Sequence, residues 1–209
     1  YLLTVSGRID GSSRFGKNNR YGVFPAASLG WVLTKESFFS GSDILSFLKL
    51  RTSYGLTGNA GIGNFGHLGL YGVSKYNSIG GIIPSQIGNP DLGWESTSQV
   101  DFGIDYGFFK NRISGEIDYY IKKTKNLLLD VPVPETSGYS VLLENIGSVQ
   151  NKGFEFVINT NNITGSFTWN TNINFSYNKN KVTSLGSQKM IDNGSARYMN
   201  IVKVGQPIG

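Results

Sequence analysis

Alternation of apolar and polar side chains along short segments is the feature that most constrains the fold of this chain. In residues 113–122, every second residue is apolar or glycine, and the residues between them include Glu116, Asp118 and Lys122. Residues 167–178 repeat the pattern, with aromatic and aliphatic residues alternating with asparagine, threonine and serine. Successive side chains of a β-strand point to opposite faces of a sheet, so this period predicts strands with one apolar and one polar face.

The spacing of these segments predicts two kinds of connection. We expect strands at residues 2–10, 21–33, 48–56, 99–106, 112–126, 153–159, 166–180 and 198–204. Tight turns are expected at 108–112 and 161–165, and a moderately long connection at 35–46. Long loops rich in glycine and asparagine are expected at 57–95, 129–147 and 185–196. Short turns at one end and long loops at the other are typical of outer-membrane β-barrels.

Composition narrows the choice of environment. Charged residues make up 16% of the 209 residues, below the ~25% of an ordinary soluble domain. No apolar run approaches the ~20 residues of a transmembrane helix, so any membrane span must be β. The chain contains no cysteine, and Tyr1 does not open a signal peptide, so we expect the natural N-terminus to lie upstream.

Two all-β architectures satisfy the alternation. In a soluble β-sandwich the apolar faces of two sheets pack together, whereas in a membrane barrel they face lipid. Strands 112–126 and 166–180 are longer than the ~5–6 residues usual in globular proteins, which favours an antiparallel transmembrane β-barrel.

The barrel hypothesis assigns the strand residues to two surfaces. Lumen-facing residues are expected to be Asp101, Asp105, Glu116, Asp118, Asn170, Asn172 and Asn174. Lipid-facing residues are expected to be Phe102, Ile104, Ile117, Tyr119, Phe154, Phe156, Phe167, Trp169 and Phe175.

Four long blocks carry a resemblance to a known family. They are DGSSRFGKNNRYGVFPAASLGW from Asp10, LKLRTSYGLTGNAGIGNF from Leu48, NPDLGWESTSQVDFGIDYGFFKNRISGEIDYYIKKTKNLLL from Asn89 and NIGSVQNKGFEF from Asn145. Together they cover most of the chain. The sequence resembles barrel segments of the SusC/RagA family of TonB-dependent outer-membrane transporters.

The resemblance implies a part of a barrel of about 22 strands in the outer membrane of a Gram-negative bacterium. Residues 1–209 would be a partial barrel domain of roughly seven to eight strands, with the plug domain and the remaining strands absent. Family members import large nutrients, mostly oligosaccharides and less often peptides. Their partners are the TonB complex, which acts through the plug region, and a SusD-like surface lipoprotein.

Motifs that could indicate an enzyme or a cofactor do not meet the requirements of those sites. Gly61–Gly66 matches G-x-G-x-x-G but is not followed by a helical pattern. Glu116 and Asp118 share a strand face and are interpreted as solvated residues of the lumen. His67 lacks partners for a metal or a catalytic triad. We therefore expect no enzyme activity, metal or cofactor, and no binding of nucleic acid by the Lys122, Lys123, Lys125 cluster, which should face solvent or headgroups.

Aromatic residues of the long loops are the expected contacts to substrate or lipoprotein, namely Phe65, Tyr71, Tyr76 and Tyr139. Flat aromatic faces stack on sugar rings or peptide side chains. A passive outer-membrane channel and a soluble sugar-binding β-sandwich remain as alternative functions.

Overall fold

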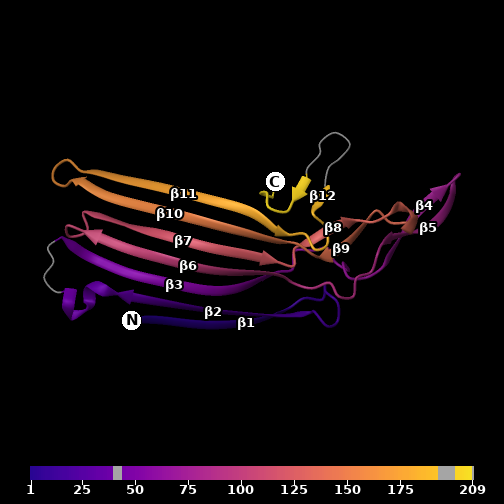
Figure 1. The fold of residues 1–209 in the computed structure, drawn as a ribbon, viewed down its shortest axis with the longest axis horizontal. Coiled ribbons are helices and arrows are strands. Elements are labelled where there is room, and N and C mark those ends of the chain that lie inside the picture. Colours follow the sequence, from indigo (N-terminus) through magenta and orange to yellow (C-terminus); the bar gives the residue numbers. More distant parts are fainter. Residues whose placement is uncertain (40–43, 193–200, 209) are drawn as a thin grey trace.

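One large antiparallel sheet dominates the computed structural model, which describes residues 1–39, 44–192 and 201–208. Its order is β1-β2-β3-β6-β7-β10-β11 (Figure 1). The seven strands are β1 (Leu2–Gly11), β2 (Tyr21–Val32), β3 (Leu45–Asn59), β6 (Glu95–Phe108), β7 (Ile113–Lys125), β10 (Ser148–Ile163) and β11 (Trp169–Ser184). The all-β antiparallel architecture is confirmed.

Smaller elements complete the described part of the chain. Three two-stranded sheets are β4 (Leu70–Tyr76) with β5 (Ile79–Gln86), β8 (Leu128–Pro132) with β9 (Val141–Asn145), and β12 (Met190–Asp192) with β13 (Ile201–Lys203). Three single-turn 3-10 helices are η1 (Leu33–Lys35), η2 (Ser37–Phe39) and η3 (Glu135–Ser137). None of the described helices is long and apolar enough to cross a membrane.

The two ends of the sheet differ as expected (Figure 1). At one end, which we call the turn end, residues 109–112 join β6 to β7 and residues 164–168 join β10 to β11. In the first turn Phe109, Lys110 and Asn111 have positive φ angles. Bonds from the Phe109 N–H to the Ile44 carbonyl (2.8 Å) and from the Lys110 N–H to Ser46 Oγ (2.6 Å) tie this turn to the start of β3 and the residue before it.

The opposite, loop end carries structure that the sequence did not reveal. Residues 57–95 and 129–147 were expected to be loops, but they contain the hairpins β4–β5 and β8–β9. Asn77 and Ser78 join β4 to β5 with φ angles of 46° and 67°. Two successive left-handed residues are typical of a type I′ hairpin turn. Because Asn-Ser is a weaker turn signal than Asn-Gly, the hairpin was missed.

The register of the sheet separates two faces. Phe102 of β6, Tyr119 of β7, Phe154 of β10 and Tyr177 of β11 are direct neighbours in one row. The next row toward the turn end contains Ile104, Ile117, Phe156 and Phe175. We call this side the apolar face, and the side that carries Asp101, Glu116 and Asp118 the polar face. The period-2 pattern thus persists from strand to strand.

Buried hydrophobic residues lie near the loop end and not in the middle of the sheet. Val149, Val182, Leu185 and Ile191 form a buried cluster there. By contrast, large side chains of the apolar face are exposed, for example Phe102 at 53%. The other sheets of the described residues are two-stranded ribbons, and the apolar face of the large sheet is exposed, whereas in a β-sandwich it would be packed against a second sheet. A contiguous exposed apolar face of this extent needs a nonaqueous neighbour.

Pro25 lies inside β2. It is paired with Gly7 of β1, but the pairing of β2 with β3 begins only at Ala26. Proline has no N–H to donate to a neighbouring strand. The residues of β2 on the loop side of Pro25 therefore pair with β1 alone.

Gly153 of β10 provides a test of how the polar face is packed. A Cβ atom on Gly153 would lie 2.3 Å from the ring of Tyr120, whose hydroxyl reaches Asn178 Oδ1 at 3.4 Å. We expect Gly153→Val to displace this ring and to destabilise the intact protein by about 1–3 kcal/mol. Urea unfolding, followed by the difference in gel mobility between folded and unfolded protein, measures this effect.

The control is Gly7→Val, because a Cβ atom at Gly7 meets nothing within 4 Å. This variant should unfold at the wild-type urea concentration. Equal losses in the two variants would contradict the packing role of Gly153.

Candidate transport surface

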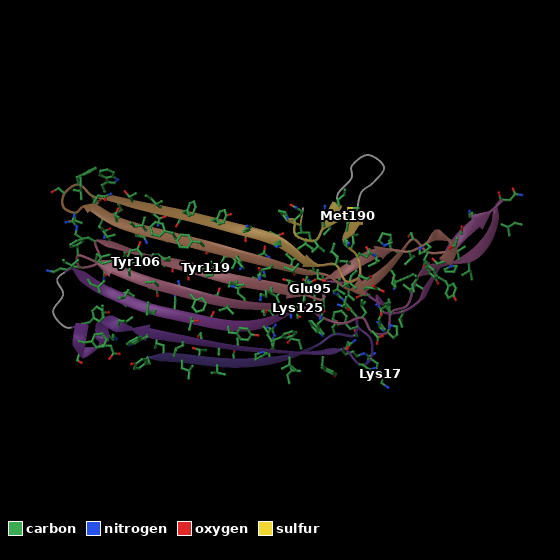
Figure 2. The ribbon with its side chains drawn as sticks, viewed as in Figure 1. Lys17, Glu95, Tyr106, Tyr119, Lys125 and Met190 are labelled. Carbon is green, nitrogen blue, oxygen red and sulfur yellow. The ribbon has the colours of Figure 1, made fainter. Side chains whose placement is uncertain are left out.

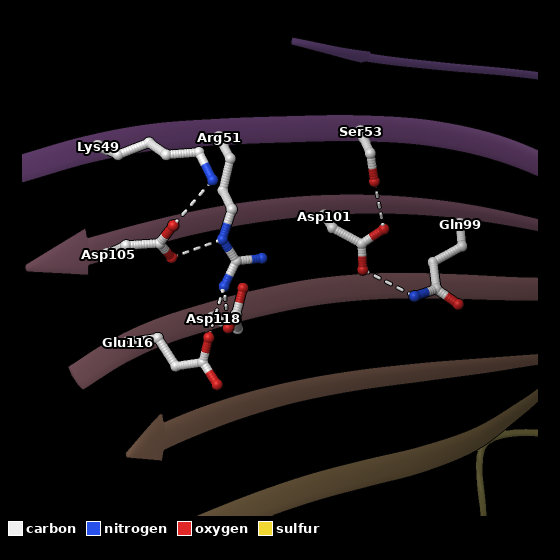
Figure 3. A network of polar contacts seen from close by, with 8 residues as sticks. All are labelled: Lys49, Arg51, Ser53, Gln99, Asp101, Asp105, Glu116 and Asp118. Carbon is white, nitrogen blue, oxygen red and sulfur yellow. Dashed lines mark hydrogen bonds and ion pairs between the residues drawn. The ribbon is translucent and has the colours of Figure 1, made fainter. Parts of the chain in front are cut away.

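An ion-pair network crosses three strands of the polar face near the turn end (Figure 3). Arg51 of β3 donates from Nε to Asp105 Oδ1 of β6 at 2.7 Å and from Nη2 to Asp118 Oδ2 of β7 at 2.6 Å. The same Nη2 lies 3.3 Å from Glu116 Oε2, and Lys49 Nζ lies 3.0 Å from Asp105 Oδ2. Two cations therefore neutralise most of the charge of three carboxylates.

A glycine makes this arrangement possible. Gly103 of β6 lies directly between Arg51 and Asp118 in the register. A Cβ atom on Gly103 would stand 2.6 Å from Arg51 Cζ and from Asp118 Oδ1. The guanidinium can thus lie flat across β6 and bond to β7 beyond it.

Asp101 belongs to a separate group, four residues from Asp105 along β6 toward the loop end (Figure 3). Its carboxylate accepts from Ser53 Oγ at 2.8 Å and from Gln99 Nε2 at 2.7 Å. Asp101 thus has neutral partners, and its charge remains available at the surface of the polar face.

Asparagine side chains dominate the polar face of β10 and β11. Asn172 donates to Asn159 and accepts from Asn174 Nδ2 at 2.9 Å. Nearer the loop end, Asn180 Nδ2 donates to Asn151 Oδ1 at 2.7 Å. Each amide has both donors and acceptors, so these rows bond to one another and offer the same groups to hydroxyl-rich or amide-rich molecules.

The residues predicted for the lumen and those predicted for lipid lie on opposite faces of the sheet, except for Phe167. The carboxylates and asparagines predicted for the lumen lie on the polar face, Asp101, Asp105, Glu116, Asp118, Asn170, Asn172 and Asn174. Phe102, Ile104, Ile117, Tyr119, Phe154, Phe156, Trp169 and Phe175 occupy the apolar positions. Phe167 lies in the 164–168 turn, because this turn comes three residues later than the predicted 161–165.

At the loop end, the segment 89–94 contacts the β1–β2 connection. Phe15 is fully buried, with its ring 5.2 Å from that of Trp94. The indole N–H of Trp94 donates to the Arg20 carbonyl at 3.1 Å, and the Gly16 N–H donates to the Leu92 carbonyl at 3.1 Å. These contacts fix the loop that precedes β2 against the segment that precedes β6.

The same segment also contacts the β7–β10 connection through Asn145. Asn145 accepts from the Gly93 N–H at 2.7 Å and donates to the Gly93 carbonyl at 2.8 Å. Asn89 Nδ2 donates to the Leu143 carbonyl at 3.0 Å. We call residues 89–94 the loop clasp, since they connect two loops that are far apart in sequence. The clasp is the NPDLGW segment, which has neither the alternation of a strand nor a motif of a known site.

The four predicted loop aromatics belong to different parts of the loop end. Tyr71 lies in β4 and is 74% exposed, and Phe65 lies before that strand with a left-handed φ of 63°. Tyr76 ends β4, whereas Tyr139 is half-buried near the tip of the β8–β9 hairpin. The β4–β5 hairpin extends far from the sheet (Figures 1 and 2).

The glycine motif and His67 have structural roles. No helix follows Gly61–Gly66 among the described residues, so the context of a dinucleotide site is missing. His67 Nδ1 lies 3.0 Å from the Arg14 carbonyl, and Arg14 Nε donates to Asn64 Oδ1 at 3.2 Å. These bonds attach the glycine-rich loop to the β1–β2 connection.

Arg51 allows a quantitative test of the network. We expect a double-mutant cycle of Arg51→Ala and Asp105→Asn in the intact protein to give a coupling energy of about 1–2 kcal/mol, because both groups are partly shielded from water. The reference cycle uses Arg8→Ala and Asp10→Asn, a 2.7 Å pair with an exposed arginine. This pair should couple by less than ~0.5 kcal/mol. Equal coupling in the two cycles would contradict a special role of Arg51.

Comparison with known proteins places these features in a family. Residues 1–202 match the family model described as TonB dependent receptor-like, beta-barrel. TonB-dependent receptor P39 of Formosa agariphila is 44% identical over 211 residues, covering 100% of this chain and 20% of the relative. TonB-dependent receptor SusC of Bacteroides thetaiotaomicron is 41% identical over 195 residues, covering 88% of this chain and 19% of the relative.

Solved structures agree with the sequence relatives. The structure of the RagAB peptide transporter superimposes with a TM-score of 0.89 at 35% identity, covering 99% of this chain and 23% of that chain. The chain spans about a fifth of the length of the curated relatives that it matches. The expected fold and localisation are confirmed: the chain belongs to the TonB-dependent receptor-like β-barrel family, and it resembles the SusC/RagA proteins of the outer membrane of Gram-negative bacteria.

Proposed function

We propose that this chain forms part of the barrel wall of a TonB-dependent importer of large nutrients, and that it is not an enzyme. In this proposal the importer acts with a SusD-like surface lipoprotein. The observation that carries the proposal is the two-faced single sheet. Its apolar face fits lipid, and its polar face fits a water-filled lumen.

The apolar face supports contact with the membrane. Its strand positions carry no aspartate or glutamate in the described residues. A carboxylate among hydrocarbon chains would lose its hydration without compensation. The rows from Phe102 to Tyr177 and from Ile104 to Phe175 would thus contact acyl chains.

The polar face supports contact with substrate or with a plug inside the lumen. Near the turn end, Lys49 and Arg51 neutralise most of the carboxylate charge within the network, so the network is suited to the structure of the wall. Asp101 lies farther toward the loops, whereas the asparagine side chains run along β10 and β11 from Asn172 near the turns to Asn180 nearer the loops. These groups leave donors and acceptors accessible on the polar face. Amides and carboxylates bond well to sugar hydroxyls, which favours oligosaccharides. Peptides, which RagAB is named for transporting, are the second substrate class.

The β4–β5 hairpin is the proposed lipoprotein contact. Tyr71 and Val73 lie beside Pro84 and Ile82 on one face of this hairpin, and Val73 is 86% exposed. Exposed aliphatic and aromatic side chains on a projecting element favour a protein partner. Phe65, Tyr76 and Tyr139 would extend the contact surface toward substrate or lipoprotein.

Energy coupling tests the transport proposal. Cells that express the intact protein should take up fluorescent oligosaccharides only when their TonB complex functions, because a plugged barrel does not open by diffusion alone. Uptake of labelled peptides in the same cells distinguishes the two substrate classes. Unchanged uptake without TonB function would support a passive channel and overturn the proposal.

The hairpin provides a second test. We expect Val73→Asp with Ile82→Asp to reduce copurification of the lipoprotein at least roughly tenfold, because two charges would be buried at the interface. Ser74→Asp, on the opposite face of β4, is the matched control and should retain the partner. Heat-modifiable gel mobility checks that each variant is assembled. Full retention by the double variant would exclude this face as the contact.

A further inference from the structure

Five lysines form a patch on the apolar face of the sheet. Lys123 and Lys125 belong to β7, Lys152 to β10, and Lys179 and Lys181 to β11. All five side chains are exposed. The neighbouring Lys122 lies on the polar face, so the lysine cluster seen in the sequence is divided between the two faces. We call the five residues the lysine patch.

The patch begins next to the row that runs from Phe102 to Tyr177, on the side of that row nearer the loop end. From Phe154 and Tyr177 toward the loop end, the next row contains Lys152 and Lys179. The row after it contains Lys123, Gln150 and Lys181, and Lys125 follows beside Ser148. Tyrosines mark the boundary between hydrocarbon and headgroups in membrane barrels. We therefore expect the lysines to lie at the depth of the lipid headgroups, on the loop side of the membrane. Figure 2 labels one of them, Lys125, near the loop end of β7.

The patch is local and lacks counter-charges. Lys152 and Lys179 are direct cross-strand partners, an arrangement of like charges that destabilises a sheet. No ion pair in the described part of the chain involves any of the five lysines. On β6, the same rows contain Val100, Ser98 and Ser96. A general preference for cations at the interface would distribute lysines around the wall, whereas here they occur on three adjacent strands.

We propose that the lysine patch binds the phosphate groups of lipopolysaccharide in the outer leaflet of the outer membrane. The inference goes beyond transport and rests on the membrane orientation in which long loops face outward. In this orientation the patch meets the phosphorylated sugar headgroup, while the aromatic rows below it meet the acyl chains. Phosphate between Lys152 and Lys179 would remove their repulsion.

Retention of lipid by the purified intact protein tests this site. We expect Lys152→Gln, Lys179→Gln and Lys181→Gln together to weaken the binding of lipopolysaccharide on the order of 100-fold, at about fivefold per lysine, and so to lower the amount that copurifies. Mass spectrometry of protein purified in mild detergent measures it. Lys122→Gln on the polar face is the control and should keep the wild-type amount, as should the corresponding triple Lys→Arg variant.

Reconstitution distinguishes the ligand from other sources of the effect. Lipopolysaccharide in nanodiscs should raise the Tm of the wild type but not of the triple Gln variant. Enzymatically dephosphorylated lipopolysaccharide and millimolar inorganic phosphate should each fail to do so. Equal lipid retention by wild type and triple variant, equal stabilisation by the dephosphorylated lipid, or stabilisation by inorganic phosphate alone would overturn the proposal. No transport step enters these measurements, so failure of the import proposal would be seen separately.

Discussion

Backbone hydrogen bonding between neighbouring strands is the constraint on which the rest of this structure depends. At membrane depth no water can replace a missing partner, so each N–H and C=O group must bond within the sheet. The long antiparallel pairings between neighbouring strands from β1 to β11 satisfy this need for backbone hydrogen bonds within the sheet. β1 and β11 are the outermost strands of the large sheet, and in a closed barrel such edges pair with further strands. The lipid then takes the place of a hydrophobic core.

Glycines on the strands allow the polar face to be linked across the sheet. Gly103 lets Arg51 lie over β6, and Gly153 lets Tyr120 lie over β10. In each case the long side chain reaches the second strand away, Asp118 for the arginine and Asn178 for the tyrosine. These links run perpendicular to the strands and add to the backbone ladders. The side chains of the wall therefore link its strands and neutralise most of the charge of the Arg51 network from within the sheet.

Alternation was sufficient to predict the faces of the strands, because a residue's face follows from parity alone. It could not predict which strands are neighbours when an insertion separates them. The pairing of β3 with β6, which brings Arg51 to Asp105, depends on chain topology, and so the network was not predicted. The loop clasp was also missed, since Asn145 acts through its amide on the backbone of Gly93. Such contacts have no periodic signal in a sequence.

The features of the wall change in character from the turn end to the loop end. Near the turns, Arg51 and its carboxylates bond mainly to one another. At the loop end, the clasp fixes the bases of two connections, whereas the β4–β5 hairpin beyond it exposes Tyr71 and Val73. The lysine patch lies between these levels, on the apolar face. Polar groups that bond to one another stabilise the wall. Charged and apolar groups without a partner in the sheet are available to bind other molecules. The unbalanced charge of Lys152 and Lys179 and the exposed apolar face of the hairpin are therefore the strongest indications of external partners.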